Sequence, residues 1–112
     1  MLNWEFYQYT TEPERMIASA LIDLALHHGL SISVHDSEEW TLEKSQDKAE
    51  IQKALATTGE DTLRLFAGDD AIGSVWLVWG NGEHLISDYS WSQEEHEQQM
   101  TSLCESAMEV AQ

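Results

Sequence analysis

The sequence predicts a single α+β domain, with one mostly antiparallel sheet and helices packed mainly on one of its faces. The chain has 112 residues, which suits one domain with one hydrophobic core. Apolar residues recur at helical spacing in some segments and alternate with polar residues in others. Turn-forming residues separate these segments. The predicted order is α-β-β-α-β-β-β-α over residues 1–112, with residues 1–10 as an added edge strand or an aromatic arm.

The first helix is expected to begin at a capping box formed by Thr11 and Glu14, with Pro13 in the first turn. Gly29 supplies its C-terminal stop. Its apolar stripe is expected at Ile17, Ala18, Leu21, Ile22, Leu24, Ala25 and His28.

Two further helices are expected. A short one begins at Asp47, buries Ile51 and Leu55, and ends at Thr58-Gly59. In the final helix, Ser92 and Glu95 are expected to form the N-terminal cap. The buried stripe of that helix is predicted at His96, Met100, Leu103, Cys104, Ala107 and Val110.

Five strands are predicted in two groups. The first hairpin is expected to place Ile32, Val34, Trp40 and Leu42 on one face. Three more strands follow, separated by the turn 68–70 and by Asn81-Gly82, which is typical of a two-residue hairpin. The apolar run 75–79 favours a central strand covered on both faces. Within that run, Trp76 and Trp79 must point to opposite faces.

The charge excludes some functions. There are 21 acidic and 5 basic side chains, giving a net charge of -16. Binding to nucleic acid or to an anionic membrane needs clustered Lys and Arg, which this chain lacks. Residues 65–112 carry nine acids and no Lys or Arg. This distribution either maintains solubility alone or forms a negative surface that binds a basic one.

The sequence predicts no catalytic residues, cofactor or metal. Its histidines and single cysteine lack the spacing of a zinc site, and structural roles are expected for His28 and His96. The acidic clusters 36–39 and 69–70 fit solvated turns better than a calcium loop. Cys104 cannot form an internal disulfide. The first residues lack the pattern of a signal peptide, which favours a cytoplasmic protein.

Two segments resemble small acidic proteins encoded by bacteriophages and prophages. These are residues 34–40, VHDSEEW, and residues 73–89, which contain GSVWLVWGNG and end in ISDY. The resemblance extends over about half of the chain, from the first hairpin to the last strand. It implies a phage or prophage origin in a bacterial cytoplasm, and it assigns no functional residues.

A small acidic phage protein without catalytic residues suggests a stoichiometric inhibitor. The expected target is the Lys/Arg-rich surface of a host defence complex that binds nucleic acid, as in an anti-CRISPR or anti-restriction protein that mimics DNA. Exposed aromatics beside the acids would anchor the interface. The predicted contact residues are Asp69, Asp70, Glu83, Asp88, Tyr89, Trp91, Glu94, Glu95 and Glu97.

A second function stays open from the sequence. The chain would then be an accessory or regulatory protein-binding module, acting alone or as a homodimer, in which charge serves only solubility. Its contact surface would be apolar and would involve N-terminal aromatics such as Tyr7 and Tyr9.

Overall fold

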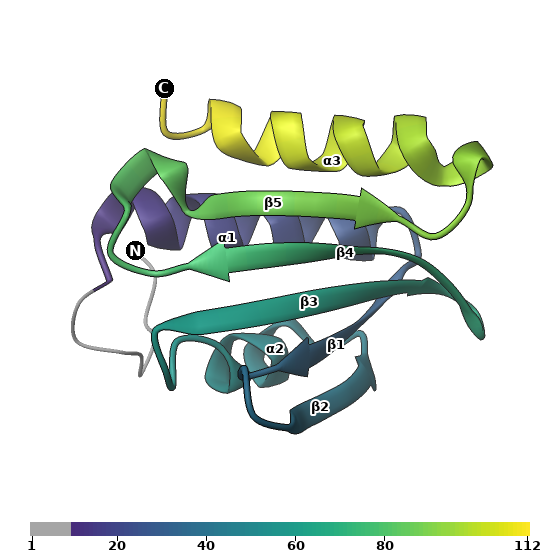
Figure 1. Cartoon of the computed structure of the whole chain (residues 1–112), viewed down its shortest axis with the longest axis horizontal. Helices are drawn as coiled ribbons and strands as arrows, with labels where there is room; N and C mark the ends of the chain where they lie inside the picture. Colours follow the sequence, from purple (N-terminus) through teal and green to yellow (C-terminus); the bar gives the residue numbers. More distant parts are fainter. Residues whose placement is uncertain (1–9) are drawn as a thin grey trace.

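A computed structural model describes residues 10–112 and confirms the predicted order of helices and strands (Figure 1). The helices are α1 (Glu12–His27), α2 (Lys48–Ala54) and α3 (Glu97–Glu109). The strands are β1 (Ser31–His35), β2 (Trp40–Ser45), β3 (Glu60–Ala67), β4 (Asp70–Val78) and β5 (Ile86–Trp91). Short 3-10 turns lie at η1 (Gly82–His84) and η2 (Glu94–His96). The predicted edge strand or arm at residues 1–10, with Tyr7 and Tyr9, lies outside the described residues, except for Thr10.

The five strands form one sheet in the order β2-β1-β3-β4-β5, and every neighbouring pair is antiparallel. The helices pack on one face, where α3 lies along β5 and also contacts α1 (Figure 1). Alternate residues of the central strands point into this layer, so that Leu63, Leu65, Val75 and Leu77 are fully buried. The core therefore lies between the helices and one face of the sheet.

Helix α1 begins as the sequence predicts. The Thr11 hydroxyl accepts a hydrogen bond from the Glu14 backbone N–H, and the Glu14 carboxylate accepts one from the Thr11 N–H at 2.7 Å. Glu14 is fully buried, and its other carboxylate oxygen accepts hydrogen bonds from the N–H groups of Gly80 and Asn81. The Glu14 side chain thus caps α1 and also binds the backbone that follows β4.

The predicted turn at residues 68–70 forms, whereas the predicted two-residue turn at Asn81-Gly82 does not. Gly68-Asp69 forms the two-residue turn between β3 and β4, with Gly68 at φ +61°. Asn81-Gly82, which was expected to be such a turn, lies in a longer connection that contains η1. Trp79 packs into the core at this point. The N–H groups of Gly80 and Asn81 donate to the Glu14 carboxylate, so they do not form the hydrogen bonds of a tight hairpin. These tertiary contacts outweigh the local preference of Asn-Gly.

Helix ends also depart from the prediction. The expected cap by Ser92 and Glu95 does not form; η2 intervenes, and α3 begins at Glu97 without a side-chain cap. His28 is exposed because α1 ends at His27, and Val110 is exposed because α3 ends at Glu109. Helix α2 already ends at Ala54, before the predicted stop at Thr58-Gly59.

The run 75–79 is not covered on both faces. Trp79 is buried, at 6% exposure, whereas Trp76 is 43% exposed on the helix-free side of the sheet. Trp40 was expected on the same face of the hairpin as Val34, which is buried, but it is 42% exposed. Register shifts between β1 and β2 separate Trp40 from the face of Val34, and Trp40 instead lies opposite His35.

Candidate functional site

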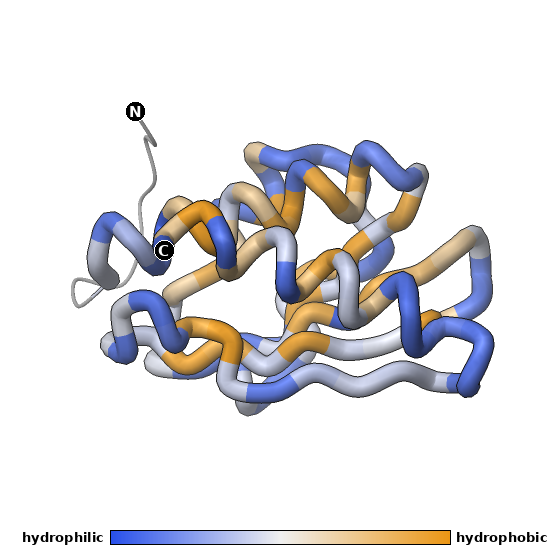
Figure 2. The backbone as a smooth tube through the Cα atoms, turned by 90° about the horizontal axis from the view of Figure 1, so that it is seen from above, coloured by the Kyte–Doolittle hydropathy of each residue, from blue (hydrophilic) through white to orange (hydrophobic). Residues whose placement is uncertain are grey.

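Five of the predicted contact residues lie at one end of the molecule. Trp91 of β5 pairs with Gly73 near the start of β4, so the turn after β5 is brought beside the turn between β3 and β4. We call this region the acidic end; its residues are Asp69, Asp70, Glu94, Glu95 and Glu97. Figure 2 shows hydrophilic segments at this end of the molecule, on the right, as well as at the opposite end.

A shallow hollow joins the two turns of the acidic end. Asp69, Asp70 and Glu95 line it together with His96. Carboxylates from segments about 25 residues apart in the chain therefore share one small surface. Such a grouping produces a locally negative potential that can attract a basic partner.

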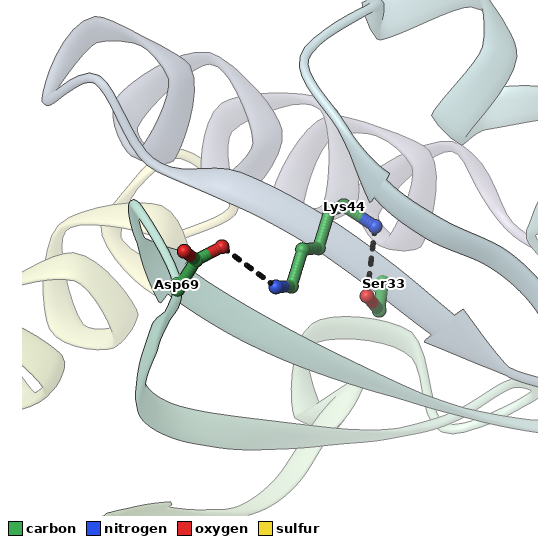
Figure 3. A network of polar contacts seen from close by, with 3 residues as sticks. All are labelled: Ser33, Lys44 and Asp69. Atoms are coloured by element: carbon green, nitrogen blue, oxygen red, sulfur yellow. Dashed lines mark hydrogen bonds and ion pairs between the residues drawn. The ribbon is translucent and has the colours of Figure 1, made fainter.

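The ion pair between Lys44 and Asp69 at the acidic end is exposed and weak. Lys44 Nζ lies 3.2 Å from Asp69 Oδ1, and the Lys44 backbone N–H donates to the Ser33 hydroxyl at 2.9 Å (Figure 3). The Asp69 side chain is fully exposed, so water and salt screen this pair. Glu95 lies 3.5 Å from His96 Nε2, a contact that is ionic only when the histidine is protonated.

Of the other predicted contact residues, Trp91 ends β5 beside the acidic end, and the rest lie elsewhere. Glu83 belongs to η1, at the opposite end of the sheet, and lies 3.8 Å from His84 Nε2. Asp88 faces the helix-free side, beside Trp76. Tyr89 is partly buried against the core, 6.4 Å from the Trp91 ring, which is 40% exposed. The nine predicted residues thus occupy separate parts of the surface rather than one continuous face.

The helix-free side of the sheet carries a second group of candidate residues, which the sequence prediction missed. We call it the open face. Cross-strand pairing aligns five of its side chains in a row that crosses all five strands: Trp40, His35, Thr62, Trp76 and Asp88. Glu60, Arg64, Phe66, Ser74 and Ser90 flank this row on the same side by strand alternation.

Charged side chains hold the aromatics of the open face. The Arg64 guanidinium lies 5.2 Å from the centre of the Trp40 ring, and Lys44 Nζ lies 4.9 Å from the centre of the Phe66 ring. The indole nitrogen of Trp76 donates to Glu60 Oε1 at 2.9 Å. The face is therefore ordered in advance, which lowers the entropy that a partner must offset on binding.

One signal in the sequence could have located this face. Trp76 and Trp79 were correctly placed on opposite sides of their strand, so one of them had to leave the core. Because the register shift in β1–β2 leaves no mark in the apolar pattern, Trp40 could not be assigned in the same way.

Asp61 is a buried acid that lies outside both surfaces. Its Oδ2 accepts hydrogen bonds from the Ala56 N–H at 2.7 Å and from the Trp79 indole at 2.8 Å. Its Oδ1 has no hydrogen-bond partner among residues 10–112. Burial raises the pKa of Asp61 to about 6, against the lowering effect of these two donors, and the nearby Asp36 charge adds to the increase. Its hydrogen bonds connect β3 to the chain after β4, which indicates a structural role.

The acidic cluster at residues 36–39 forms a turn, as predicted. Asp36 Oδ1 accepts hydrogen bonds from the N–H groups of Glu39 and Glu38, and these bonds lower the pKa of Asp36. Among the described residues, no group of three or more His, Cys, Asp or Glu side chains is placed to hold a metal ion. Over the same residues, no helix has the length and apolar character needed to cross a membrane.

Comparison with known proteins adds no relative. The chain matches no family model, and no similar curated protein or solved structure was found.

Proposed function

We propose that this chain is a non-catalytic acidic protein that binds the Lys/Arg-rich surface of a host protein and keeps nucleic acid away from it. More specifically, we propose that it inhibits a bacterial defence complex, as anti-CRISPR or anti-restriction proteins do, and that a phage or prophage encodes it. The contact surface is the acidic end, with Asp69, Asp70 and Glu95 at its centre.

One observation carries the proposal. The fold brings carboxylates from two distant segments around one exposed hollow, in a half of the chain that has no Lys or Arg. Within the described residues, the nearby basic side chain is Lys44, contributed by β2. A basic partner would supply the counter-charges that this surface lacks, and it would approach faster as ionic strength falls.

A second candidate function is supported by the open face. Two tryptophans more than 40% exposed, held by Arg64 and Glu60, are typical of a protein interface rather than of a solvated sheet. In this alternative, the chain is an accessory or regulatory binding module and its acids serve solubility.

The decisive experiment is a pull-down from the native host, followed by competition between this protein and DNA for the captured partner. The test variant is Glu94→Gln/Glu95→Gln/Glu97→Gln, which removes three charges from the acidic end. Glutamine is preferable to lysine because these residues begin η2 and α3, where a positive charge would oppose the helix dipole.

The matched control is Glu38→Gln/Glu39→Gln/Glu83→Gln, which removes the same charge at the far end of the sheet, in the β1–β2 turn and in η1. We expect the test variant to lose competition about tenfold or more and to have a smaller salt dependence, while the control stays close to the parent. An equal loss of competition in both triple variants would mean that net charge alone causes the effect. Unchanged competition by the test variant would remove the acidic end from the interface.

A further inference from the structure

We propose that two copies of this chain associate face to face through the open face, about a twofold axis that runs along the row from Trp40 to Trp76. This inference goes beyond the proposed function, because it concerns a different surface. The acidic end lies in turns at one end of the sheet and stays accessible in such a dimer.

The composition of the open face favours a protein partner. Trp40 and Trp76 are both exposed, and Arg64 lies between their strands on β3. Tryptophan and arginine are the residue types that most often carry binding energy at interfaces. The aromatic rings are already fixed by Arg64 and Glu60, so little side-chain freedom remains to be lost on association.

The charges of the face select a second copy as the occupant. A twofold interface places a patch against itself, so a patch of one sign would repel its own copy. Most of this molecule is acidic, but the open face carries both signs: Lys44 and Arg64 lie on one side of the row and Glu60 on the other, while Asp88 ends the row on β5.

The positions of Arg64 and Glu60 match a specific axis. Both residues lie on β3, each two residues from Thr62, and Thr62 belongs to the row that crosses the sheet. A twofold axis along this row exchanges the two sides of β3. It therefore brings Arg64 of one copy opposite Glu60 of the other, twice in each dimer.

The same axis brings like aromatics together. Trp40 and Trp76 lie in the row itself, so each meets its counterpart in the second copy. A hollow of about 120 Å³ lies beside Trp76, lined by Thr62, Ser74, Asp88 and Ser90 among others, and offers room for part of an indole ring. Because the axis is perpendicular to the strands, the two sheets pack with their strands nearly aligned, as sheets in a sandwich do.

The size of the face is adequate. Five strands about 4.8 Å apart span roughly 24 Å, and the paired segments run about 20 Å along the strands. The flat area is then about 500 Å², and side-chain relief brings the accessible area closer to the roughly 800 Å² that each partner contributes to a standard interface.

The test is the mass of the full chain in solution, measured by sedimentation equilibrium over a wide concentration range. We expect a dimer of twice the 12.7 kDa chain mass. Arg64→Glu and Glu60→Arg, each alone, should weaken the dimer about tenfold or more, because each places like charges across the axis. The double variant Glu60→Arg/Arg64→Glu should restore association to within a few-fold of the parent, because it reverses both members of the pair.

Lys53→Glu and Glu105→Arg are the matched controls, since they make the same charge changes at exposed helix positions away from the sheet face. They should leave the dimer unchanged. Circular dichroism and urea unfolding confirm that each variant folds. Glu60→Arg also removes the hydrogen bond to Trp76, and this loss alone could prevent folding. In that case acrylamide quenching of tryptophan fluorescence in the parent tests the proposal, because quenching should fall as the dimer forms.

Three results would overturn the proposal. The first is a chain that stays monomeric across the range. The second is a dimer that the single charge reversals leave intact, or that the double reversal does not restore. The third is quenching of the tryptophans that does not change with association. None of these results bears on the acidic end, so the proposed function can fail or hold separately.

Discussion

Asp61 and Trp79 form a buried hydrogen bond between the start of β3 and the residue that follows β4, with Asp61 Oδ2 2.8 Å from Trp79 Nε1. Asp61 also accepts from the N–H of Ala56, which has a positive φ of 58°. Its Oδ2 oxygen therefore connects three parts of the chain, whereas its Oδ1 oxygen has no hydrogen-bond partner among the described residues. This geometry makes the stability of the fold sensitive to the charge on Asp61.

The first prediction concerns pH. Burial raises the pKa of Asp61 from 3.8 to about 6, so the folded chain holds this proton more tightly than the unfolded chain. Protonated Asp61 therefore stabilises the fold below pH 4, and this contribution is lost as the pH rises through about 6. Relative to Asp61→Asn, the parent should lose about 3 kcal/mol of unfolding free energy over that window.

Urea unfolding of both proteins at several pH values between about 5 and 7.5 checks this difference, of which about 1 kcal/mol should fall within that range. The comparison with Asp61→Asn cancels the titration of the other acids. A difference that does not vary with pH would show that Asp61 has an ordinary pKa.

The second prediction concerns the Glu14 clamp. Glu14→Ala leaves the N–H groups of Thr11, Gly80 and Asn81 without their acceptor, so we expect a loss of about 2–4 kcal/mol in unfolding free energy. Thr11→Ala removes only the helix cap and should cost about 1 kcal/mol. Glu12→Ala, an exposed acid in the same turn, is the control and should have little effect. Thermal or urea unfolding ranks the three variants.

The third prediction concerns the contact between β4 and α3. A Cβ at Gly73 would overlap the backbone carbonyl oxygen of Ser90 and lie 2.7 Å from Met100 Sδ. Gly73→Ala should therefore destabilise the protein by about 1–3 kcal/mol through overpacking. A Cβ at Gly59 meets no atom within 4 Å, so Gly59→Ala should be nearly neutral. Equal melting temperatures for the two variants would contradict the close packing of α3 on β4.

The fourth prediction concerns the single cysteine. Burial raises the pKa of the Cys104 thiol to about 12, and the nearby Glu105 charge adds to the increase. The folded protein should therefore react slowly with a disulfide reagent, at a rate set by local opening, and rapidly in urea. The variant Cys104→Ser/Ser102→Cys moves the thiol to an exposed position of α3 and should react at once. Fast labelling of native Cys104 would mean that α3 detaches readily.

The sequence was sufficient to predict the order of helices and strands, because the patterns that indicate these elements are local. The capping box of Thr11 and Glu14, the stop at Gly29 and the turn at residues 68–70 all predicted what the structure contains. The errors arose where distant contacts decide the conformation. The second role of Glu14, at Gly80 and Asn81, converts an expected two-residue turn into a longer connection, and no local pattern reports it.

The candidate sites were predicted less well for the same reason. Charge counting identified the acidic half of the chain, but strand pairing decides that Glu95 reaches Asp69 and Asp70 while Glu83 does not. The open face depends on register. One shift in β1–β2 is enough to move Trp40 from the expected face, shared with Val34, to the exposed side of the sheet.

The irregular outer strand β2 has a consequence for aggregation. Two register shifts distort its pairing with β1, and Lys44 within it has a positive φ of 47°. A distorted edge with a lysine is a poor template for another strand. At the other margin of the sheet, α3 packs along β5. Edge-to-edge growth into fibrils is thereby obstructed on both sides, and a concentrated solution of this protein should resist amyloid formation.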